Sequence, residues 1–152
     1  MTRQIYLAGR YSRRAEIKAY ALQLQETGYG ITSRWLDSAS ALTSEGLSEE
    51  APYAERVRLA EQDWQDLMAA DTCISFTEPP RANVTRGGRH VELGAALAAG
   101  KRVIVIGHRE NVFHCLPLIE FYPTWQSCFQ MLSCLAPMVH AQRPGLAGPR
   151  KL

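Results

Sequence analysis

The feature that most constrains the fold is a glycine-bounded helix signal followed at once by a strand signal, in RGGRHVELGAALAAGKRVIVIG at residues 86–107. The largely apolar stretch at 89–99 stops at Gly100, a residue that commonly ends helices. RVIVIG, with the continuous apolar run Val103–Ile106, has the length of a strand. A helix that leads directly into a fully apolar strand is typical of a parallel sheet covered by helices. We therefore expect an α/β fold.

The same alternation recurs along the chain. Further strands are predicted at residues 4–8, 29–35, 72–76 and 120–122. Helices are predicted at residues 13–27, 52–70, 89–99 and 125–135, the first with Ser12 as its N-cap. Right-handed crossovers between such elements predict a doubly wound parallel sheet of about five strands. We expect a single domain over residues 1–137 and a flexible tail over 138–152.

Composition excludes several classes of protein. With 152 residues, 46% hydrophobic and 21% charged, the chain has the composition of one globular domain. It carries no apolar run long enough to span a membrane, no signal-peptide pattern and no CxxC pair among its four cysteines. These features predict a cytoplasmic protein with reduced thiols and no membrane partner. The arginines cluster in two short loops, which suits a small anion better than a nucleic acid.

In doubly wound folds, ligands bind at the carboxyl ends of the strands, where the strand order reverses. The loops that follow the predicted strands are therefore the candidate site. These loops are residues 9–14, 34–37, 76–89 and 107–116.

Glu92 is the carboxylate inside the otherwise apolar part of the helix at 89–99. A helix N-terminus favours an anion, so we expect it to keep this acid ionised against the effect of burial. An ionised and partly desolvated carboxylate can act as a nucleophile. The alternative is a glutamate placed early in a helix only because the helix dipole favours it there.

Asp63 is the second acid in an unusual position. It shares a helix face with Ala60 and Leu67, part of an apolar stripe that also includes Trp64, whereas Asp66 lies further round. Asp63 either caps a neighbouring group or serves chemistry. Two carboxylates directed at one sheet edge indicate glycosidic-bond cleavage, in which one attacks the anomeric carbon and the other assists the leaving group.

Three segments together resemble the nucleoside 2-deoxyribosyltransferase superfamily, which includes nucleotide N-hydrolases. They are IYLAG, EQDWQDLMAADTCISF and GGRHVELGAALAAGKRVIVIG, and the resemblance covers about residues 4–116. It implies a flavodoxin-like sheet and a homodimer or higher homo-oligomer with shared active sites. It also implies that Glu92 attacks C1′ of the sugar, Asp63 assists departure of the base and Tyr6 orients Glu92. No metal or other cofactor is expected.

The chain departs from many transferases at GRYSRR after the first strand and at RGGRH before Glu92, so the branch of the superfamily stays open. Arginines beside a helix start suit a 5′-phosphate, whereas solvated or acid-paired arginines are the alternative. Trp35 is a candidate for base stacking or for the core edge. The full set of candidate substrate contacts is Gly9, Arg10, Ser12, Arg13, Arg14, Trp35, Gly88, Arg89, Asn111 and His114, the last two across a subunit interface.

The sequence thus predicts cleavage of the N-glycosidic bond of a (deoxy)nucleoside 5′-monophosphate. Base exchange between deoxynucleosides is the alternative within the same chemistry. A nucleotide-binding module without catalysis is the alternative from another class.

Overall fold

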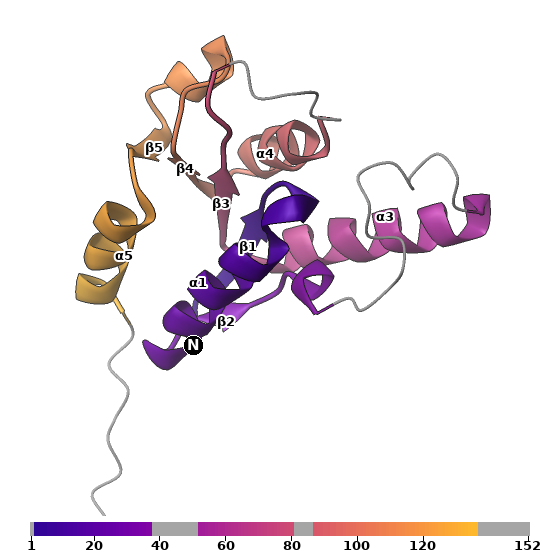
Figure 1. The fold of residues 1–152 in the computed structure, drawn as a ribbon, viewed down its shortest axis with the longest axis horizontal. Coiled ribbons are helices and arrows are strands. Elements are labelled where there is room, and N and C mark those ends of the chain that lie inside the picture. Colours follow the sequence, from indigo (N-terminus) through magenta and orange to yellow (C-terminus); the bar gives the residue numbers. More distant parts are fainter. Residues whose placement is uncertain (1, 38–51, 81–86, 137–152) are drawn as a thin grey trace, which may run out of the picture.

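A computed structural model describes residues 2–37, 52–80 and 87–136 and shows a parallel sheet with helices on both faces (Figure 1). The strands are β1 Gln4–Ala8, β2 Gly30–Ile31, β3 Thr72–Phe76, β4 Arg102–Ile106 and β5 Ile119–Tyr122. The helices are α1 Arg14–Glu26, α3 Tyr53–Ala69, α4 Gly88–Ala98 and α5 Trp125–Cys134, and the short 3-10 turns are η1 Tyr11–Arg13, η2 Arg34–Leu36 and η3 Val112–Cys115. The predicted loop at 37–50, apart from Asp37, and the predicted tail lie outside the described residues.

The five strands are all parallel and run in the order β2-β1-β3-β4-β5. This is the flavodoxin-like order, which reverses between β1 and β3. The register pairs Tyr6 with Cys73 and Cys73 with Val103 across the three central strands. The predicted fold class is confirmed. Because every strand is parallel, the loops that follow the strands meet at one edge of the sheet.

Alternating side chains divide the interior into two cores. On one face, Leu7 and Ile74 pack with Ile17 of α1 and Leu132 of α5. On the other face, residues such as Tyr6 and Cys73 pack with apolar side chains of α3 and α4. Both faces of the central strands are dry, which accounts for the continuous apolar run of β3.

The first crossover begins differently from the prediction. Ser12 does not cap α1, because residues 11–13 first tighten into η1 and the helix begins at Arg14. Arg13 occupies the N-cap position and makes no side-chain capping bond. The expectation of Ser12 as N-cap is therefore wrong.

The second strand is shorter than predicted, because beyond Ile31 side-chain hydrogen bonds take the place of its backbone hydrogen bonds to β1. The ladder ends at Ile31, and the Ser33 hydroxyl then accepts a 2.6 Å hydrogen bond from the Leu7 amide. The Leu7 carbonyl in turn accepts a 2.8 Å bond from the Trp35 indole nitrogen. The side chains of Ser33 and Trp35 thus satisfy the hydrogen-bonding groups of the Leu7 backbone in β1. The chain then turns toward α3.

The apolar stripe predicted on α3 is buried only toward its C-terminal end. Leu67 is buried at 1% exposure, whereas Trp64 is 54% exposed, so the expectation that Trp64 lies in the core is wrong for this chain by itself. The neighbouring Asp63 is half-buried and Asp66 is buried, so Trp64 lies on another face of α3, away from the sheet. The N-terminal part of α3 extends past the sheet (Figure 1). Within the described residues, no helix is long and apolar enough to cross a membrane.

Two glycine-to-alanine changes should have opposite effects on stability. Gly107 ends β4 with φ +111°, and a Cβ there would lie 2.9 Å from the Thr77 hydroxyl. Gly107→Ala should therefore lower the free energy of unfolding by about 1–3 kcal/mol. Gly94 lies in α4 with open space where a Cβ would be placed, so Gly94→Ala should raise it by about 0.5–1 kcal/mol. Urea unfolding of both variants tests this pair, and equal effects would contradict it.

Candidate active site

Tyr6 and Glu92 meet at the point where the strand order reverses. Tyr6 is fully buried in β1, and its hydroxyl donates a 2.6 Å hydrogen bond to Oε1 of Glu92 in α4. Leu93 and Ala96 seat α4 on the same face of the sheet as Tyr6. The neighbouring Glu92 is thereby held at the edge of this core, within reach of a buried phenol.

Burial controls the charge of Glu92. It raises the pKa of this carboxyl to about 7, the Tyr6 hydrogen bond opposes the rise, and the nearby charge of Asp63 adds to it. The sequence predicted that the helix start would keep Glu92 ionised, but burial is the larger effect. Near neutral pH, Glu92 is therefore divided between its neutral acid and its nucleophilic carboxylate.

Asp63 supplies the second carboxyl, from α3. Burial is the first cause that raises its pKa to about 6; Asp66 raises it further, and Arg34 opposes the rise. Asp63 also acts electrostatically on both Glu92 and Tyr6, so the three groups form one electrostatic unit. With two neighbouring pKa values near 6 and 7, the carboxyl pair holds about one proton near neutrality. Such a pair offers one carboxylate and one acid.

Tyr6 remains the donor in this arrangement. Burial, followed by the charges of Glu92 and Asp63, raises its pKa well above the usual value of a phenol. The hydroxyl therefore keeps its proton and orients one oxygen of Glu92. This geometry suits the orienting role predicted for Tyr6.

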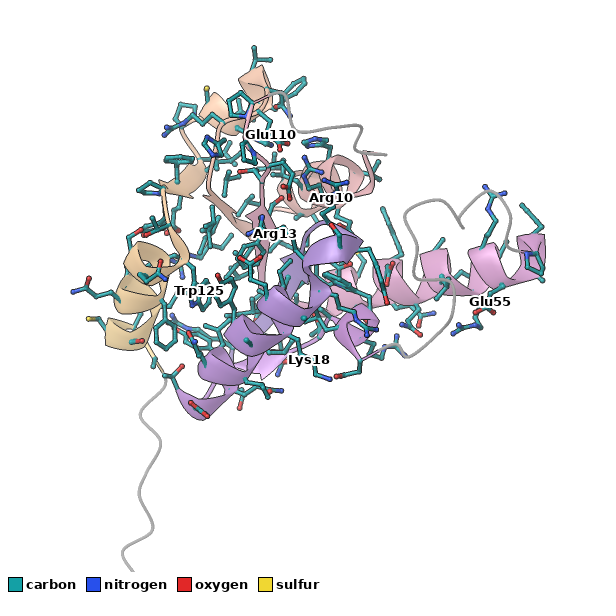
Figure 2. All side chains as sticks on the ribbon, viewed as in Figure 1. Arg10, Arg13, Lys18, Glu55, Glu110 and Trp125 are labelled. Atoms are coloured by element: carbon teal, nitrogen blue, oxygen red, sulfur yellow. The ribbon has the colours of Figure 1, made fainter. Side chains whose placement is uncertain are left out.

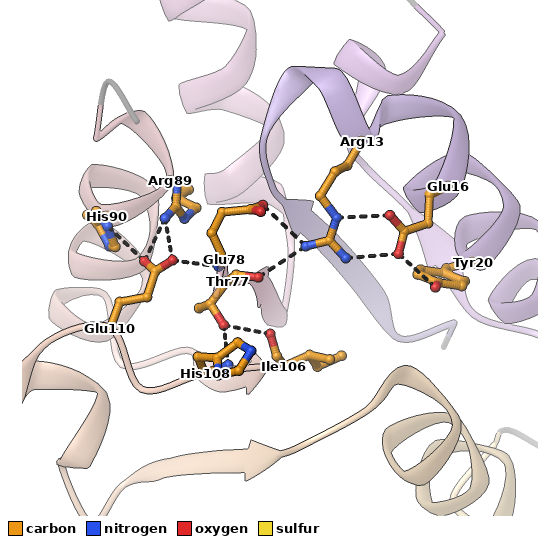
Figure 3. Close-up of polar contacts among 10 residues, drawn as sticks. All are labelled: Arg13, Glu16, Tyr20, Thr77, Glu78, Arg89, His90, Ile106, His108 and Glu110. Atoms are coloured by element: carbon orange, nitrogen blue, oxygen red, sulfur yellow. Dashed lines mark hydrogen bonds and ion pairs between the residues drawn. The ribbon is translucent and has the colours of Figure 1, made fainter. Parts of the chain in front are cut away.

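In the loop after β1, where arginines were predicted to bind a phosphate, Arg13 forms ion pairs with acidic side chains. Figure 3 shows that Arg13 pairs with Glu16 at 2.8 Å and with Glu78 at 3.3 Å, and that it donates to the Thr77 carbonyl at 3.1 Å. Its charge joins the loop after β1 to the loop after β3. The observed role of Arg13 is thus a link between two site loops, and its contact with a phosphate stays a prediction.

Arg89, at the start of α4, also forms an ion pair with an acidic side chain. Its guanidinium is buried and lies 2.6 Å from both carboxylate oxygens of Glu110. Glu110 also pairs with His90 at 3.2 Å and accepts from the backbone amide of Glu78 (Figure 3). Sequence reasoning did not single out Glu78 or Glu110. The available signal was their place in the loops after β3 and β4.

Other predicted contacts also have partners within the chain. Asn111 caps η3 by accepting from the amides of Phe113 and His114. His114 is buried, and its Nδ1 accepts a 3.1 Å bond from the Glu110 amide. The predicted contacts of Asn111 and His114 across a subunit interface stay predictions.

The remaining candidates lie along the same edge of the sheet. Trp35 is partly buried between the two cores with its ring centroid 6.3 Å from that of Tyr11, a position that fits the core-edge alternative. Arg14 lies with its guanidinium carbon 5.3 Å over the Tyr11 ring. A Cβ on Gly9 would lie 2.3 Å from Cδ1 of Ile17, so Gly9 permits close packing. Ser12 is exposed, Gly88 opens α4, and Figure 2 places Arg10 near Arg13.

Several buried polar atoms in the elements that border the carboxyl edge of the sheet have no hydrogen-bond partner within the described part of the protein. Among the described residues, those without a protein hydrogen-bond partner are the Tyr11 hydroxyl, Asp63 Oδ1, the Ser75 hydroxyl, Arg89 Nε and His90 Nδ1. They come from η1, α3, β3 and the first turn of α4. A buried polar atom without a partner costs about 1–3 kcal/mol. Their concentration here indicates a site with hydrogen-bonding capacity for a polar ligand. The described part of the chain contains no cluster of metal-ligating side chains.

The raised pKa of Glu92 predicts a pH-dependent stability difference. The folded-state pKa of about 7 exceeds the ordinary value of 4.5, so the folded protein binds more protons between these values and loses stability as pH rises. Glu92→Gln has no ionisable carboxyl at this position and therefore does not lose this stability as pH rises. Its free energy of unfolding relative to wild type should therefore increase from pH 4.5 to 8, by on the order of 3 kcal/mol. Chemical unfolding across this pH range checks it, and a constant difference would contradict the burial of Glu92.

Two solved enzyme structures have the same fold as this chain. The 2-deoxyribosyltransferase of Bacillus psychrosaccharolyticus superposes with a TM-score of 0.64 at 18% identity, over 83% of this chain and 90% of that one. The CMP N-glycosidase BcmB of Clostridium botulinum superposes with a TM-score of 0.57 at 20% identity, over 87% and 99%. No protein-family model and no curated protein sequence matches the chain. The chain therefore shares the fold of these two enzymes, and the resemblance indicated by its sequence is confirmed at the level of the fold.

Proposed function

We propose that this chain is an enzyme of the nucleoside 2-deoxyribosyltransferase superfamily that cleaves the N-glycosidic bond of a (deoxy)nucleoside 5′-monophosphate. The observation that carries the proposal is the Tyr6–Glu92 hydrogen bond at the strand-order reversal, with Asp63 acting on both groups. Both enzymes with the same fold have names that place them in N-glycosidic chemistry. The flavodoxin-like fold by itself hosts many functions, so the argument depends on these residues.

The carboxyl pair supports a two-step reaction from the singly protonated form in which the proton lies on Asp63 and Glu92 is ionised. This is the less populated of the two singly protonated forms, because the pKa of Glu92 is the higher. The Glu92 carboxylate attacks C1′ and forms a C–O bond as the bond from C1′ to the base nitrogen breaks. The electron pair leaves with the base, which takes the proton of Asp63. Water then attacks C1′, releases Glu92 and gives a proton back to Asp63. The products are free base and sugar phosphate, and both carboxyls return to their starting states.

The preference for a nucleotide draws on the loop after β1 and on one comparison. Arg10 and Arg14 flank η1 at the carboxyl end of β1, where a phosphate next to the sugar subsite would lie. One enzyme of the same fold is named as a CMP N-glycosidase. Arg13 and Arg89 contribute indirectly, because their ion pairs hold the loops that carry this subsite. Assembly into a homo-oligomer with shared sites remains part of the proposal.

Removing the nucleophile should abolish turnover without unfolding the protein. Glu92→Gln keeps the side-chain volume, so release of base should fall at least about 10³-fold. Tyr6→Phe keeps the ring and loses the bond to Glu92, so a loss of about tenfold is expected. Glu61→Gln, on the exposed face of α3, is the matched control and should keep the wild-type rate. Chromatographic assay of free base measures all three, and a wild-type rate for Glu92→Gln would exclude the proposed nucleophile.

The pH dependence of kcat/KM should be bell-shaped. Below pH about 6 both carboxyls are protonated and no nucleophile remains, whereas above about 7 both are ionised and no proton reaches the base. The two limbs belong to the pair and not to either residue alone. Initial rates from pH 4.5 to 9 check this. A rate that rises to a plateau and stays there would remove the proton-donating role from Asp63.

A substrate panel decides between hydrolysis and base exchange. The panel contains ribo- and deoxynucleosides and their 5′-monophosphates, each with and without adenine or cytosine as acceptor. Free base from monophosphates alone would support the proposed hydrolase. A new nucleoside formed only with acceptor would establish the transferase alternative. Nucleotide binding without release of base would indicate the non-catalytic alternative.

A further inference from the structure

An ion pair joins η2 to α3 beside the proposed active site. Oδ1 of Asp66 accepts a 2.6 Å hydrogen bond from Nε of Arg34, and Oδ2 accepts a 2.9 Å bond from the Arg34 backbone amide. The Asp66 side chain is 7% exposed and that of Arg34 is 56% exposed. The carboxylate end of the pair is therefore dry, while the guanidinium end reaches solvent.

The pair lies next to Asp63. Residues three apart on a helix are neighbours on its surface, so Asp66 is one turn from Asp63 along α3. After burial, the charge of Asp66 is the main influence that raises the pKa of Asp63, and Arg34 acts in the opposite direction. The two halves of one ion pair thus have opposing effects on the same carboxyl.

The same pair fixes the loop that contains Trp35. Asp66 holds the first residue of η2 through its backbone, and Trp35 follows with its indole nitrogen bonded to the Leu7 carbonyl. The distance between α3 and this loop is therefore set by a two-point contact. The Asp66–Arg34 pair therefore fixes the position of η2 and also places two opposite charges near Asp63.

We propose that the Asp66–Arg34 ion pair is a positioning device for Asp63, in which the buried carboxylate favours a proton on Asp63 and the guanidinium limits this effect. The inference rests on the proposed function, because it assigns that proton to the departing base. Among the described residues, the other ionisable groups that interact electrostatically with Asp63 are Tyr6 from β1 and Glu92 from α4. Neither changes in the variants described next.

The test compares Asp66→Asn with Arg34→Gln. Carboxyl NMR of the labelled, ligand-free protein gives the pKa of Asp63, and the high-pH limb of the pH–rate profile, where the proton donor is lost, follows its role in turnover. Asp66→Asn should lower the pKa of Asp63 by about one unit, and Arg34→Gln should raise it. A purely structural role would make both variants lose activity alike, because both break the pair, and it would not shift the pKa in opposite directions. Shifts in the same direction, or none, would overturn the inference.

Arg34→Lys completes the set, because it keeps the charge and loses the planar guanidinium. It should retain a pKa of Asp63 near that of wild type while KM changes through a looser η2. If Asp66→Asn does not fold, the exposed Arg34 side chain still allows the Gln and Lys variants to be compared. Opposite shifts without any release of base would overturn the proposed function alone. Turnover of nucleotides without opposite shifts would overturn this inference alone.

Discussion

The structure depends on placing a partly buried carboxyl against a fully buried phenol whose raised pKa keeps it protonated. Glu92 reaches that position because α4 packs through Leu93 and Ala96 on strands whose two faces are both buried. The hydrogen bond from Tyr6 offsets part of the cost of burial. A sheet edge with a less rigid core would let water reach the carboxyl and return its pKa toward the ordinary value. The packing of this edge and the raised pKa of Glu92 therefore have one physical origin.

Much of the fold could be predicted from local sequence patterns. The apolar runs of β1, β3 and β4 are continuous because both faces are covered, and the structure has their predicted bounds. Glu92 was identifiable because an acid in an apolar helix requires an explanation. The length of β2 was not predictable, because side chains of Ser33 and Trp35 replace the ladder through contacts with a residue more than 25 positions away.

The pairing of the arginines was also beyond local patterns. Arg13 meets Glu78 at a sequence separation of 65, and Arg89 meets Glu110 at a separation of 21. A cluster of arginines in sequence suggests a positive surface, but these two cations are neutralised by carboxylates from other loops. Only the spatial arrangement shows that their charge joins loops together. The exposure of Trp64 was missed for a related reason, since helical periodicity alone does not show which face of α3 packs on the sheet.

The side-chain closure of β1 by η2 has a consequence for the solubility of the protein. An unpaired strand edge is a template on which another chain can add a strand. Here β2 ends at Ile31, and the Leu7 amide and carbonyl beyond it are occupied by a serine and a tryptophan side chain in place of a backbone. The loop that borders the proposed site thus also protects the sheet from intermolecular pairing. Loss of either side chain would leave a hydrogen-bonding group of Leu7 open at the edge of the sheet.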